Sequence, residues 1–165
     1  MKTSLLTTKQ RGSSTMDLLI YSAVIISLIL FVVTKVPDIV SGLRISSFQS
    51  DASTISNAAY RWKKGRSNYA TVSLTKICNQ DILPKGGSIC GAANTGVGTN
   101  PYGGNWTVTA NSNPGLYNVS ATLPNDADTL GELSDAMAPV TRGACQEATG
   151  CSTLIAAGTT ITMTY

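Results

Sequence analysis

The chain has 165 residues, about the length of one domain, and 42% of them are apolar whereas 13% are charged and 6% are aromatic. It contains no histidine, which excludes His-based catalytic triads, His-ligated metal sites and imidazole acid–base chemistry. The sequence also lacks a glycine-rich phosphate-binding loop. We therefore expect a protein that is not an enzyme and that needs neither a metal nor a cofactor.

The net charge of +3 comes from the start of the chain. Lys2, Lys9 and Arg11 precede the most apolar stretch, and from Ser13 onward there are nine basic and nine acidic residues. A protein that binds a polyanion carries its basic excess on the folded domain. The charge distribution therefore argues against nucleic acid as a direct ligand.

Within the neutral remainder the two signs of charge are segregated. Residues 13–76 have a net charge of +4 and residues 77–165 have a net charge of −4. Two interpretations are open at this point. The subunits are dipolar and attract one another head to flank, or the charges form two solvated faces of one domain.

Sixteen consecutive residues, 18–33, carry no charge. The wider segment 16–36 is long enough to cross a hydrocarbon layer of about 30 Å as a helix. Because the basic residues precede this segment, we expect the N-terminus in the cytoplasm and the remaining chain outside. Residues 33–38 read VTKVPD and offer no small-residue cleavage site, which disfavours an ordinary removed signal peptide.

The helix is predicted to continue beyond the membrane as an amphipathic segment over residues 38–64, with Gly65 as its C-terminal stop. Pro37 and Gly42 interrupt it, so we expect a kink or a melted stretch there. The apolar stripe of the amphipathic half should pack on the C-terminal domain. Its members are Ile45, Phe48, Ala52, Ile55, Ala59 and Trp62.

An even number of cysteines, Cys78, Cys90, Cys145 and Cys151, follows the membrane segment, in the compartment expected to be oxidising. They predict two disulfides, because a zinc site would lack both histidine and a Cys-x-x-Cys pair. Proximity favours pairing the first two cysteines with each other and the last two with each other. A longer-range pairing stays open.

The C-terminal region reads as a small antiparallel sheet of three to five strands that packs on the amphipathic helix. The turn at 111–115 separates two alternating segments and so predicts a hairpin. The other elements are expected from the positions of turn and cap residues and from the hydrophobic periodicity. They are a loop over 66–104 with one strand at 71–77, hairpin strands at 106–110 and 116–123, a helix opening at 124–126 and ending at Pro139, and a last strand at 159–165.

Residues 9–17 read KQRGSSTMD. This segment resembles the processing signal of type IV prepilins, which has a basic leader, a glycine before the cleaved bond and an acidic fifth residue. The resemblance implies a leader over residues 1–12, cleavage by prepilin peptidase between Gly12 and Ser13, and N-methylation of Ser13. In the family the fifth residue is normally glutamate and the first is aromatic or methionine. Here Asp17 and Ser13 stand in those places.

In the family, the acidic side chain neutralises the N-terminal amine of a neighbouring subunit during assembly, and the resemblance gives this role to Asp17. Simple electrostatics agrees, because a carboxylate buried in a helical bundle requires a cationic partner. The alternative is an aspartate that lies at the membrane interface and favours the start of the helix.

Residues 100–104 read NPYGG and resemble the Asn-Pro-Phe-Gly-Gly turn that precedes the sheet in several type IVb pilins. The likeness covers the whole chain in layout, but only 9–36 and 100–104 match in motif. It implies an α+β, pilin-like fold, with a helix over 13–64 packed on a head over 65–165.

The resemblance implies a structural subunit that polymerises with itself into an extracellular filament serving adhesion, aggregation or conjugation. Its other partners would be prepilin peptidase and the pilus assembly machinery of the bacterial inner membrane, where the precursor resides. Two alternatives remain. One is a minor pilin or secretion-system pseudopilin, and the other is an uncleaved, membrane-anchored binding domain.

Overall fold

The computed structural model describes residues 15–165. Its elements divide between two compact units, with the boundary between Ser41 and Gly42 inside the first helix. The expected α+β architecture of a long N-terminal helix and a small antiparallel sheet is confirmed. In chain order the elements are α1 (Thr15–Lys63), α2 (Leu74–Asn79), β1 (Trp106–Ala110), β2 (Tyr117–Thr122), η1 (Ala127–Thr129), α3 (Leu130–Met137), η2 (Ala138–Val140), β3 (Leu154–Ala157) and β4 (Thr160–Thr164).

The four strands form one antiparallel sheet in the order β1-β2-β4-β3. β2 lies in the interior, with Val119 opposite Val108 of β1 on one side and opposite Met163 of β4 on the other. Side chains alternate between the two faces of the pleated strands, so these residues share one face. All three are buried, and this face forms the floor of the core.

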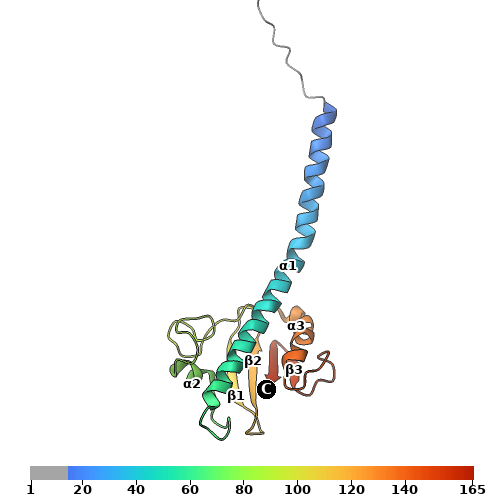
Figure 1. The fold of residues 1–165 in the computed structure, drawn as a ribbon. Coiled ribbons are helices and arrows are strands. Elements are labelled where there is room, and N and C mark those ends of the chain that lie inside the picture. Colours follow the sequence, from blue (N-terminus) through green and yellow to red (C-terminus); the bar gives the residue numbers. More distant parts are fainter. Residues whose placement is uncertain (1–14) are drawn as a thin grey trace, which may run out of the picture. The chain divides into compact units, whose positions relative to one another are not determined.

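The second half of α1 lies across that face of the sheet (Figure 1). The predicted apolar stripe is confirmed, because Phe48, Ala52, Ile55, Ala59 and Trp62 are buried and Ile45 is partly buried against the same core. The ring of Phe48 lies 4.5 Å from that of Trp106 in β1 and 5.8 Å from that of Tyr102, measured between ring centroids. The amphipathic half of α1 therefore belongs to the head rather than to the apolar segment before it.

α3 packs against β3 and β4, and a side-chain bond joins it to α1. The side-chain amide of Gln49 donates to the carbonyl oxygen of Ala136 at 2.9 Å, and Arg44 pairs with Asp126 at 3.5 Å. The helix expected before Pro139 is α3, and its side chains Leu130, Leu133 and Met137 are buried. The contacts of Gln49 and Arg44 therefore attach α3 and the residues just before it to the beginning of the amphipathic half of α1.

The expected strand at 71–77 is wrong, because this segment contains the helix α2. Ser73 caps the helix through its Oγ, which accepts from the backbone N–H of Lys76 at 3.2 Å. Such a cap satisfies one of the N–H groups that a helix start leaves unpaired. Leu74, Ile77 and Cys78 point from this short helix into the core. Tertiary contacts and the cap outweigh the β-branched character of the segment.

The predicted hairpin and last strand are confirmed as β1, β2 and β4. β3 was not predicted. It has four residues, and only Leu154 is buried, so it shows no clear alternation. Its pairing with β4 places it in the sheet.

The turn at 100–104 enters β1 and is built around Asn100, which is 4% exposed. The Asn100 Oδ1 accepts from the N–H groups of Tyr102 and Gly104 at 2.8 and 3.1 Å, and its Nδ2 donates to the carbonyl oxygen of Thr122 at 2.8 Å. A Cβ on Gly104 would lie 1.9 Å from that same carbonyl oxygen, so this position admits only glycine. The turn therefore ties the start of β1 to the end of β2.

Candidate functional site

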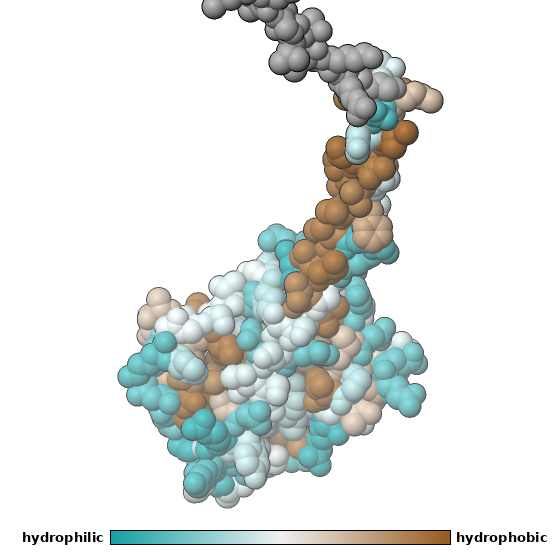
Figure 2. Space-filling model, turned by 45° about the horizontal axis from the view of Figure 1, so that its top comes forward, coloured by the Kyte–Doolittle hydropathy of each residue, from teal (hydrophilic) through white to brown (hydrophobic). Residues whose placement is uncertain are grey.

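The apolar part of α1 is exposed throughout. Figure 2 shows the hydrophobic surface following the helix over this segment. Eighteen large apolar side chains between Met16 and Leu43 are 42–70% exposed. The buried core helix of a soluble protein has a comparable composition, but none of the most apolar 18-residue window is buried here. Such a surface requires a non-aqueous environment or a partner.

The segment has the length that a membrane requires. Residues 16–36 would extend over about 31 Å at 1.5 Å per residue, which matches a hydrocarbon layer of about 30 Å. By length and composition α1 could therefore span a membrane. A signal sequence meets the same test, but α1 continues without a break beyond residues 33–38, where such a sequence would be cleaved.

Serine and threonine hydroxyls inside the apolar segment bond to the backbone of the helix itself. The hydroxyls of Ser22 and Ser27 donate to the carbonyl oxygens three residues earlier at 2.9 and 2.8 Å. Thr34 donates to the carbonyl oxygens of Leu30 and Phe31 at 3.1 and 2.9 Å. In lipid an unpaired polar group costs several kcal/mol, and these bonds avoid that cost.

Charges stand at both ends of this segment and nowhere between 18 and 34. Asp17 lies exposed in the first turn of α1, where the helix dipole favours an anion. At the other end, Lys35 and Asp38 form an exposed pair with 3.9 Å between the Nζ and a carboxylate oxygen. Asp17 is thus the charged side chain at the N-terminal end of the apolar segment.

The predicted processing residues, Gly12 and Ser13, lie outside the described residues. Pro37 and Gly42 lie inside α1, which is helical from Thr15 to Lys63, so this region is not melted and the expected kink stays a prediction. Proline removes one backbone hydrogen bond, and the bonds of the neighbouring turns keep the helix intact. A bend or local unwinding within an assembly stays a prediction.

The structure pairs Cys78 with Cys90 and Cys145 with Cys151, which is the pairing that proximity along the chain favoured. Cys78 and Cys90 are completely buried and tie α2 to the following loop. The second bridge closes a surface loop that follows α3 in the chain, and Cys145 in this loop is half-buried. Among residues 15–165 no cluster of acidic residues or cysteines could hold a metal ion.

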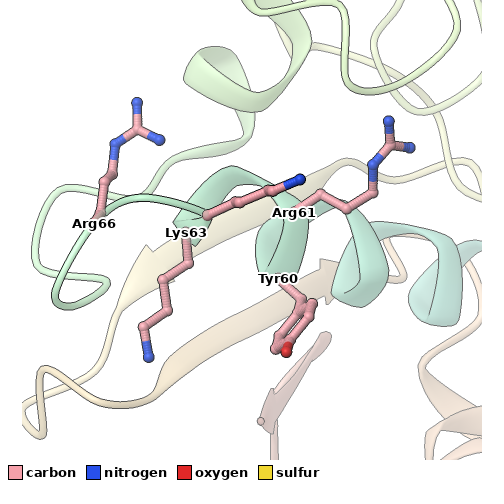
Figure 3. A pocket seen from close by; sticks show the side chains of 5 residues that line it. Tyr60, Arg61, Lys63 and Arg66 are labelled. Carbon is pink, nitrogen blue, oxygen red and sulfur yellow. The ribbon is translucent and has the colours of Figure 1, made fainter.

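The end of α1 forms a pocket of about 470 Å³ that the sequence analysis did not identify. Figure 3 shows its side chains projecting from the last turn of α1 and from the turn that follows. The sequence signal for this pocket is the cluster of four basic residues between positions 61 and 66. We call it the basic pocket, and it is lined by Tyr60, Arg61, Lys63, Lys64 and Arg66.

Contacts within the head orient these cations. The guanidinium of Arg66 lies 4.1 Å above the Trp62 ring and donates to the Trp62 carbonyl oxygen. The Nζ of Lys63 lies 4.8 Å from the centre of the Tyr69 ring. Both are cation–π contacts that hold the charge without neutralising it. The pocket therefore keeps its positive charge.

Comparisons of this chain with protein-family models, with curated proteins and with solved structures found no match.

Proposed function

We propose that this protein is a type IV pilin of the IVb kind, a structural subunit that polymerises into an extracellular filament. The observation that carries the proposal is the exposed apolar segment of α1, which begins at Asp17 and continues directly into a helix buried in the head. The prepilin-like residues 9–17 and the NPYGG turn support it.

The apolar segment of α1 would be covered in two different ways in succession. Lipid first covers the apolar segment while the precursor waits in the inner membrane. In the filament, the same segments of other copies replace the lipid. Relative to an isolated subunit in water, complete burial of one Leu, Ile, Val or Phe side chain contributes about 1.5–3 kcal/mol. The exchange of lipid for other helices has no such driving force, but a subunit that has left the membrane is held strongly in the polymer. The head then forms the outside of the filament.

Asp17 has a specific task in this assembly. A carboxylate moved from the membrane interface into a helical bundle needs a cation. Removal of residues 1–12 by prepilin peptidase would expose an α-amino group at Ser13, and the amine of a neighbouring subunit would pair with Asp17. This step aligns each incoming subunit and makes assembly depend on cleavage.

Replacement of the residue before the cleaved bond tests the proposal. We expect Gly12→Ala to block cleavage and to abolish surface filaments, whereas Thr7→Ala, elsewhere in the leader, should leave both unchanged. Electron microscopy counts the filaments, and mass spectrometry of the purified chain should give an N-terminus at Ser13 in the unmodified protein. An intact Met1 on a permanently monomeric protein would contradict the proposal and favour an uncleaved, membrane-anchored binding domain.

A further inference from the structure

The basic and acidic residues that are segregated along the sequence form two separate charged regions of the head. One concentration of charge is the basic pocket at the end of α1, where Lys64 is exposed and has no ion-pair partner among residues 15–165. The other lies on and beside α3. We call it the acidic ridge, and it consists of Asp128, Glu132, Asp135 and Glu147.

The residues of the acidic ridge lie on neighbouring segments of the head. Asp128, Glu132 and Asp135 are spaced by four and three residues, so they follow one face along η1 and α3. The Asp135 carboxylate accepts from the backbone N–H of Ala148 at 2.9 Å, which brings the loop carrying Glu147 against the end of this face. All four side chains belong to exposed residues, and none has an ion-pair partner within the described part of the chain.

The two surfaces lie at different ends of the head. α3 is fixed to the beginning of the amphipathic half of α1, where Gln49 bonds to Ala136. The basic pocket begins at Tyr60, about 16 Å further along the helix at 1.5 Å per residue. Figure 1 shows α3 near the upper part of the head and the end of α1 at the lower part. Among residues 15–165 no ion pair joins the two surfaces.

We propose that the basic pocket binds the acidic ridge of a second copy of this chain. The proposal rests on the proposed function and names the contact between neighbouring heads. Opposite charges of equal magnitude on the two halves of the sequence, +4 and −4, favour this occupant over any other anion. Complementary charge steers encounter and sets the register of the partners.

The geometry of this contact also explains an open polymer. The basic pocket and the acidic ridge are different surfaces, so the contact is heterologous, and each bound subunit presents the same two surfaces again. A heterologous contact that does not close into a ring generates a helical filament. The apolar segments supply most of the stabilisation of that filament, and the heads determine how each subunit is placed along it.

Charge reversal in the full-length protein tests the contact. Lys64→Glu and Glu132→Lys each change exposed side chains that make no hydrogen bond or ion pair within the described residues. Each places like charges together, and we expect roughly tenfold fewer sheared filaments from either variant. The chain that carries both substitutions restores opposite charge and should regain the filament yield, which also shows that the variants fold.

The matched controls are Lys85→Glu and Asp81→Lys, which make the same charge changes in an exposed pair of 3.1 Å that belongs to neither surface. We expect filament yields like those of the unmodified chain. Equal yields from all variants, or losses in the single variants without recovery in the combined chain, would overturn the contact. If the unmodified chain forms no filaments, the proposed function itself fails.

A nucleic acid is the competing occupant of the basic pocket. Fluorescence anisotropy of a labelled single-stranded oligonucleotide with the detergent-solubilised full chain distinguishes it. We expect no binding at physiological ionic strength. Oligonucleotide binding that Lys64→Glu removes, together with unchanged filaments, would assign the basic pocket to nucleic acid and overturn the proposal.

Discussion

The Tyr117 hydroxyl lies 2.8 Å from the Ser56 Oγ and donates to the Ser56 carbonyl oxygen at 3.0 Å. These bonds join the middle of the amphipathic half of α1 to the interior strand β2, across 61 residues of sequence. Tyr117 is 4% exposed, and its ring lies between those of Tyr69 and Tyr165, at 4.6 and 5.7 Å between centroids. The helix is therefore attached to the sheet by polar contacts as well as by apolar packing.

Tyr117→Phe keeps the ring and removes the bonds to Ser56. We expect the free energy of unfolding to fall by about 1–2 kcal/mol, because each buried hydrogen bond contributes about 1 kcal/mol net. Denaturant unfolding followed by the fluorescence of the buried Trp62 and Trp106 measures this change. In a double-mutant cycle with Ser56→Ala the two losses should not add, and full additivity would contradict the coupling.

Alkaline pH should weaken the same junction. Burial raises the pKa of Tyr117 from 10.0 to about 12. The bond to Ser56 opposes this rise, and Tyr69 adds a smaller further rise. Burial also raises the pKa of Tyr165. Because the unfolded chain ionises first, the stabilisation is complete below about pH 10 and is lost as the pH rises toward 12.

Unfolding free energies measured between pH 9 and pH 11.5 test this dependence. Tyr117→Phe should lose less stability over that interval than the unmodified chain, since it has one fewer group to ionise on unfolding. An identical slope in the two proteins would contradict the assignment.

Loss of the disulfide at Cys78 should cost more than loss of the one at Cys145. The first bridge spans 12 residues and the second spans 6, and the chain-entropy model gives about 3 and about 2 kcal/mol for loops of these lengths. Cys78 and Cys90 are also completely buried, so their replacement by alanine leaves space in the core. Unfolding of the two double alanine variants compares them, and equal losses would contradict this order.

Asn100→Ala should destabilise the head by about 2–4 kcal/mol, because it leaves buried backbone groups at Tyr102, Gly104 and Thr122 without their partner. Asn125→Ala is the control. That residue is exposed, and its replacement should change the unfolding free energy by less than about 0.5 kcal/mol. Similar stabilities for the two variants would show that the turn at 100–104 does not hold β1.

Asp17 provides a prediction at the level of assembly. If it pairs with a neighbouring amine, Asp17→Glu should retain filaments, whereas Asp17→Asn should reduce the sheared yield by roughly tenfold or more because an ammonium is left unpaired in the bundle. Asp38→Asn, at the other end of the apolar segment, should have little effect. Normal filaments from Asp17→Asn would leave Asp17 with a role at the helix start alone.

Periodicity alone was enough to predict the elements whose stabilisation is local or faces one surface. The apolar segment at 16–36, the stripe from Ile45 to Trp62 and the alternation of β1 and β2 each repeat with the period of their structure. Proximity likewise favoured the observed pairing of Cys78 with Cys90.

Other features of the fold could be read only from the tertiary structure, because other segments of the chain stabilise them. The segment after Thr71 is a helix whose apolar side chains, Ile77 and Cys78 among them, are buried in the core of the head. β3 shows no alternation of its own and is identified as a strand by its pairing with β4. No local pattern places Ser56 against Tyr117, or sets the basic pocket apart from the acidic ridge. Such arrangements depend on contacts between segments far apart along the chain, and a pattern in one segment carries no information about its partner.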